Sequence, residues 1–167
     1  MLLNTISNIE IELEQPENGN KSTIRYEDST FNTGSISAGE NYSLKLIAVG
    51  TWAVSVLLKD EEKLVSTIKT ETGGSMSITK CYRRKKYYFK KSQNLKLRFS
   101  LFNKNSEDLL TIIPSVNWEK KSYDFVLQIN EEFDKECNPF LILQAIHCAL
   151  CCLSMMTGGK VPALVSI

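Results

Sequence analysis

The stretch near the C-terminus from Phe140 to Met156 constrains the fold most, because it is apolar nearly all round. Signals for a helix stand at both of its ends. Asn138 suits the N-cap, Pro139 suits the first helical position, and Gly158 suits the left-handed residue that ends a helix. A helix without a polar face is enclosed by other structure or lies in a membrane. What surrounds residues 139–156 therefore decides the fold.

The length and polar residues of this helix favour a protein core over a membrane. The seventeen residues from Phe140 to Met156 would span about 26 Å as a helix, which is short for a bilayer. A spanning helix would also place Gln144 and His147 in hydrocarbon, at high cost. The polar side chains recur every three or four residues and form one stripe, which a few interior partners can satisfy: Gln144, His147, Cys151 and Ser154. We expect a core helix and no transmembrane segment, with a C-terminal membrane anchor as the alternative.

Most of the chain before this helix alternates apolar and polar residues with period two, which is typical of strands with one buried face. Eleven segments show the pattern: Ile9–Gln15, Thr23–Tyr26, Thr30–Ser37, Tyr42–Val49, Trp52–Leu58, Leu64–Thr70, Met76–Thr79, Lys86–Lys90, Leu95–Phe102, Leu109–Val116 and Tyr123–Ile129. An open sheet of that size leaves exposed edges, whereas a closed barrel removes them and can hold a helix. The sequence therefore predicts a mainly β protein: one domain, residues 1–167, forming a closed antiparallel β-barrel of about eleven strands around a hydrophobic C-terminal α-helix.

Cysteine usage and the N-terminus indicate the compartment. The five cysteines are an odd number, and Cys148, Cys151 and Cys152 share one helix, where neighbours are poorly placed to bridge one another. The N-terminal residues lack the pattern of a secretory signal and alternate like a strand. Reduced thiols and no secretion predict a cytoplasmic protein, free or peripheral to a membrane.

The order of elements resembles a known superfamily. The final predicted strand lies in KKSYDFVLQIN, Lys120 to Asn130, and leads through a short connection into the hydrophobic helix NPFLILQAIHCALCC. This pattern is similar to the tubby C-terminal-like superfamily, which also includes the LURP-one-related proteins and the phospholipid scramblases. The resemblance spans nearly the whole chain. It implies a barrel around a central helix and a binding function, since tubby domains bind phosphoinositides through basic surface residues.

Charge is distributed unevenly along the chain. The segment from Lys80 to Lys104 has ten basic residues and no acid, although the net charge of the chain is only +1. Such a segment attracts phosphates of lipid headgroups, and its interleaved aromatic residues could add contact at a membrane interface. The candidate anion-binding residues are Arg83, Arg84, Lys85, Lys86, Lys90 and Lys91. The alternative is a solvated face, because lysine and arginine also protect strands from aggregation.

Residues suited to catalysis are few. His147 is the single histidine, and it lies in the middle of the apolar helix where substrate could hardly reach it. We expect it to be enclosed and hydrogen-bonded. Cys148 and Cys151 form a C-x-x-C pair, but a zinc site needs four ligands, and free cysteine packs as a small hydrophobe. The sequence therefore predicts no enzyme activity, metal or cofactor, and no specific nucleic-acid partner. Two functions remain: a module that binds anionic lipid headgroups or other phosphorylated ligands, or a protein-interaction or structural domain without lipid binding.

Overall fold

A computed structural model of the chain describes residues 1–17, 19–38, 43–49, 55–81, 84–92, 96–134 and 138–157. The strands are, in chain order, β1 (Leu2–Ser7), β2 (Glu10–Gln15), β3 (Asn20–Tyr26), β4 (Thr33–Ala38), β5 (Ser43–Val49), β6 (Ser55–Asp60), β7 (Lys63–Thr70), β8 (Met76–Lys80), β9 (Lys85–Lys91), β10 (Phe99–Phe102), β11 (Asp108–Asn117) and β12 (Ser122–Ile129). The helices are the short 3-10 turn η2 (Thr72–Gly74), α1 (Glu131–Asp134) and α2 (Pro139–Met156).

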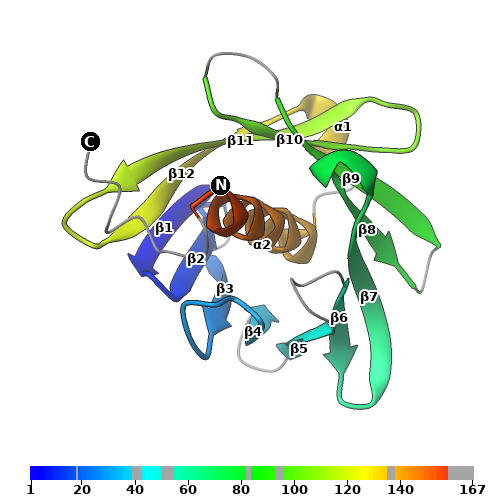
Figure 1. The fold of residues 1–167 in the computed structure, drawn as a ribbon, viewed down its shortest axis with the longest axis horizontal. Helices are drawn as coiled ribbons and strands as arrows, with labels where there is room; N and C mark the ends of the chain where they lie inside the picture. Colours follow the sequence, from blue (N-terminus) through cyan, green and yellow to red (C-terminus); the bar gives the residue numbers. More distant parts are fainter. Residues whose placement is uncertain are drawn as a thin grey trace.

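The strands form one antiparallel sheet in which each strand pairs with the next along the chain. The sheet curls into a nearly closed barrel, and α2 runs through its middle (Figure 1). The edge strands β1 and β12 lie side by side, joined by a bond from Thr5 Oγ1 to the carbonyl oxygen of Tyr123 at 2.8 Å. Lys120 Nζ adds a bond of 2.7 Å to the carbonyl oxygen of Thr5. The predicted barrel with a central helix is thus confirmed. Between β1 and β12, these side-chain bonds take the place of a strand ladder.

The helix begins where the sequence predicted. The side chain of Asn138 accepts a bond from the Phe140 amide at 2.8 Å, and Pro139 is the first helical residue. Every residue from Leu141 to Leu150 is buried, so the apolar surface of the helix faces the inward side chains of the strands around it. At about 1.5–3 kcal/mol for each large apolar side chain, this burial is a main source of stability. The predicted stop at Gly158 lies outside the described residues.

The core is built by strand alternation. Inward positions of many strands carry apolar side chains that are fully buried, among them Leu13, Ile24, Ile36, Leu46, Ile78, Phe89, Leu101 and Leu110. Phe89 stacks on Phe99 with their ring centroids 5.5 Å apart. Phe133 of α1 is also fully buried, so this short helix contributes to the same core. The period-two pattern in the sequence therefore correctly predicted which faces of these strands are buried.

Two strand predictions differ from the structure. The N-terminal residues form two strands, β1 and β2, joined by a turn at Asn8 and Ile9, so the barrel has twelve described strands and not eleven. The strand predicted over Leu95–Phe102 begins only at Phe99. Its ladder partner β9 ends at Lys91, which pairs with Phe99, so the β9–β10 ladder starts at Phe99, and only one further bond, from the Ser92 amide to the Arg98 carbonyl oxygen at 2.8 Å, extends it among the described residues. The predicted first residues Tyr42, Trp52 and Leu95 lie outside the described residues.

Gly34 of β4 lies against the backbone of β3, with no room for a side chain. It pairs with Tyr26 across the ladder, and a Cβ at this position would overlap the carbonyl oxygen of Arg25. We expect Gly34→Ala to push the two strands apart and to destabilise the fold by about 1–3 kcal/mol. Ser35→Ala, on the next residue and partly exposed, should stay within about 0.5 kcal/mol of wild type. Urea unfolding of both variants is the measurement, and equal midpoints would refute this account of the β3–β4 contact.

Candidate anion-binding surface

Strand alternation divides the predicted basic residues between two faces. Tyr87 and Phe89 of β9 are 2% and 0% exposed and face the core. The residues between and beside them, Lys86, Tyr88 and Lys90, therefore face outward, and both lysines are exposed. These three residues, with Phe102 directly opposite Tyr88 on β10, are called the β9 outer face below.

The other predicted residues lie elsewhere. Lys85 and Lys91 are the first and last residues of β9, and alternation places both on the same side of the strand as Tyr87 and Phe89. Lys85 is partly buried, and Lys91 is exposed. Burial raises the pKa of the Cys152 thiol of α2, and the positive charge of Lys91 partly offsets this rise. Lys91 is therefore oriented toward α2 and not toward the β9 outer face. Arg84 is an exposed turn residue with φ of 49°. Arg83 lies outside the described residues.

The β9 outer face alternates cations with rings. The ammonium of Lys86 lies 5.1 Å from the ring centroid of Tyr88, and that of Lys90 lies 5.9 Å from the ring centroid of Phe102. Contacts of this length are favourable cation–π arrangements. They hold the ammonium groups close to the outward rings, while both lysines remain exposed. The face thus offers two cations separated by apolar rings, which suits an interface between water and lipid.

One carboxylate partly neutralises this surface. Glu71 Oε1 accepts bonds from Ser77 Oγ at 2.7 Å and from Lys86 Nζ at 3.2 Å. These bonds, and the charge of Lys86, lower the pKa of the Glu71 carboxyl below its ordinary value. Lys69 of β7 contributes to the same lowering and pairs with Ser77, the ladder partner of Tyr88. Lys69 is therefore a member of this surface that the sequence analysis missed, since only the strand register brings it there.

The polar residues of α2 are satisfied inside the barrel. His147 is fully buried; its Nδ1 is 3.0 Å from the hydroxyl of Tyr26, and its Nε2 is 3.4 Å from Cys151 Sγ. Ser66 Oγ donates to Gln144 Oε1 at 2.9 Å. Burial lowers the pKa of His147 to about 4 and raises that of Cys151 to about 12. The enclosed, hydrogen-bonded histidine is confirmed, and both groups are neutral at physiological pH.

The described residues contain one helix that is long and apolar enough to cross a membrane, and it is α2, most of whose residues are buried in the barrel. No group of three histidine, cysteine, aspartate or glutamate side chains within the described ranges could hold a metal ion. Comparison of the chain with protein-family models, curated proteins and solved structures finds no match.

Proposed function

We propose that the protein is a non-enzymatic, cytoplasmic binding domain that holds anionic phosphate groups, above all those of lipid headgroups, on the β9 outer face. The observation that carries the proposal is the pair of outward lysines, Lys86 and Lys90, on either side of Tyr88. Each basic residue near an anionic membrane contributes about 1 kcal/mol of attraction. The resemblance to tubby-like proteins, whose basic surfaces bind lipids, supports the same function.

The uneven distribution of charge along the chain favours one orientation toward an anionic membrane. All acidic residues lie outside the segment from Lys80 to Lys104, so the rest of the chain has a net negative charge. An anionic membrane that attracts the basic segment would repel the rest of the chain. Approach with β9 toward the lipid is then favoured over other orientations. Arg84, at the turn before β9, and Lys69, on β7, would extend the contact.

A second candidate function is protein binding. Several large apolar side chains are exposed, and Trp118 in the turn between β11 and β12 is 64% exposed. Exposed aromatic residues are enriched at protein interfaces. On this alternative, the basic segment is a solvated face that keeps its strands soluble, and Lys86 already has its partner in Glu71.

Vesicle binding separates the two functions. We expect the wild type to bind vesicles of phosphatidylcholine with added phosphatidylserine or phosphoinositide at low salt, and to bind less at physiological salt because exposed charges are screened. Lys86→Glu/Lys90→Glu should weaken binding by about tenfold or more. The matched control is Lys63→Glu/Lys121→Glu, which makes the same charge change at two exposed positions elsewhere and should bind nearly as the wild type does.

Two results would refute lipid binding through β9. One is no binding of the wild type even at low salt; the other is equal loss in both double variants, which would indicate a response to net charge alone. The thermal midpoints of all the variants serve as the control for folding, since exposed substitutions usually change stability by about 0.5 kcal/mol or less.

A further inference from the structure

A row of polar side chains crosses the outer face of β3, β4, β5 and β6. The ladder places Arg25 opposite Ser35, Ser35 opposite Lys45, and Lys45 opposite Lys59. Side chains that are directly opposite on neighbouring strands have Cβ atoms about 5 Å apart and share one face. Three cations and one hydroxyl from four strands therefore lie in one line, although 34 positions separate the first from the last.

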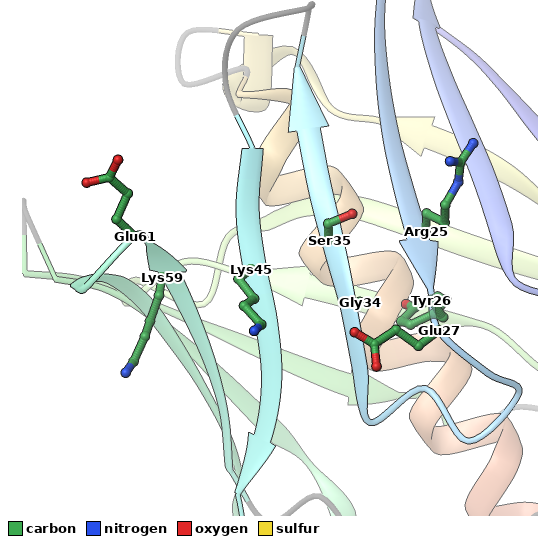
Figure 2. Close-up of a pocket in the computed structure, with 8 residues that line it drawn as sticks. All are labelled: Arg25, Tyr26, Glu27, Gly34, Ser35, Lys45, Lys59 and Glu61. Carbon is green, nitrogen blue, oxygen red and sulfur yellow. The ribbon is translucent and has the colours of Figure 1, made fainter.

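This row lines a groove of about 470 Å³. Figure 2 shows its lining residues: the side chains of Lys45 and Lys59 extend toward the same end of the strands, whereas Glu61 extends the other way. Gly34 belongs to the lining and adds no side chain. The lining has three cations, Arg25, Lys45 and Lys59, and two carboxylates, Glu27 and Glu61.

The charges around the groove are unequally satisfied. Arg25 pairs with Glu10 at 2.6 Å, and Glu27 accepts a bond from Thr33 Oγ1 at 2.9 Å. In the part of the chain that the structure describes, neither Lys45 nor Lys59 has an ion-pair partner. Like charges directly opposite each other on neighbouring strands destabilise a sheet. The two lysines therefore form a repulsive pair that an anion between them would relieve.

We propose that this groove is a binding site for a dianionic phosphate group, either a phosphate monoester or free phosphate, held between Lys45 and Lys59. Ser35 supplies a hydroxyl from the neighbouring strand, whereas the charge of Arg25 is already compensated by Glu10. A dianion matches two ammonium groups, whereas a carboxylate neutralises only one. Phosphate oxygens also accept several charge-assisted hydrogen bonds at once. The site goes beyond the proposed function, since it uses other strands and other residues than the β9 outer face.

The first experiment is an NMR titration of the full chain with inorganic phosphate, at constant ionic strength kept with chloride. We expect saturable shifts at the amides of Ser35, Lys45 and Lys59. Lys59→Glu should weaken phosphate binding by about tenfold or more, because a charged hydrogen bond is lost and a negative charge is added. Lys86→Glu/Lys90→Glu should leave the phosphate affinity unchanged.

The thermal midpoint of Lys59→Glu shows whether a loss of phosphate binding results from misfolding. Lys59→Glu places an opposite charge across from Lys45, so without phosphate it should raise the thermal midpoint by about 1–4 °C. A variant that loses phosphate binding while gaining thermal stability cannot have lost binding through unfolding. Lys121→Glu, an equal change of charge at an exposed turn, should change neither quantity.

A second arm identifies the source of the phosphate. Vesicles with phosphatidic acid present a lipid-borne phosphate monoester, and phosphatidylserine vesicles serve as the control without one. Loss of phosphatidic acid binding in Lys59→Glu would assign the groove to a lipid, and retention of that binding with loss of free phosphate would assign it to a soluble ligand. Shifts that do not saturate, or equal phosphate affinity of wild type and Lys59→Glu, would overturn the site whatever the β9 variants do in the vesicle assay.

Discussion

Lowering the pH from about 7.5 to about 5 should reduce the free energy of unfolding by about 2 kcal/mol, through His147 alone. This side chain is fully buried among Tyr26, Cys148 and Cys151, and burial lowers its pKa from 6.5 to about 4. As the pH falls, His147 therefore binds a proton near pH 6.5 in the unfolded chain, but only near pH 4 in the folded chain. The stability is fully present above pH 6.5, and it is lost as the pH falls from there toward 4.

The composition of the chain makes this measurement clean. His147 is the only histidine, and the carboxylates titrate mainly below the chosen window. Urea unfolding at several pH values gives the slope, and the single imidazole resonance gives the pKa directly. His147→Gln should flatten the slope, whereas Tyr26→Phe keeps the histidine and should keep the slope. A folded-state imidazole that titrates near pH 6.5 would contradict its enclosure.

Local signals in the sequence were sufficient for the helix and for the faces of most strands. Asn138 and Pro139 define where α2 begins because capping depends only on neighbouring residues. Period two identifies buried positions because side chains alternate along any strand. The turn at Asn8 and Ile9 was missed because Ile9 continues the alternation of the residues after it. The strand at Phe99 was made too long because alternation does not show where the partner strand ends.

The candidate surfaces depend on information that is not local. The basic residues of Lys85–Lys91 are adjacent in sequence, but strand geometry sends Lys86 and Lys90 outward and gives the two ends the opposite parity. The groove shows the converse, since Lys45 and Lys59 meet only through the register of β5 and β6. A run of charge in a sequence therefore overstates one patch, and scattered charges conceal another.

Placing a charge at a buried position of α2 should abolish soluble folding. Leu141 and Ala145 are both fully buried, and strands surround the helix on every side that Figure 1 shows. Leu141→Asp or Ala145→Arg would therefore bury a charge without a partner, at a cost that is comparable to the whole stability of a domain, about 5–15 kcal/mol. We expect both variants to be insoluble or unfolded by circular dichroism at neutral pH.

Matched controls lie on the same helix. Met155 and Met156 are 43% and 52% exposed, so Met155→Asp and Met156→Arg introduce the same charges where water can solvate them, and should change the unfolding free energy by about 1 kcal/mol or less. The contrast tests the enclosure and not helix propensity, because each pair adds the same residue type to one helix. If Ala145→Arg yields a soluble chain with the thermal midpoint of wild type, α2 does not lie inside the barrel.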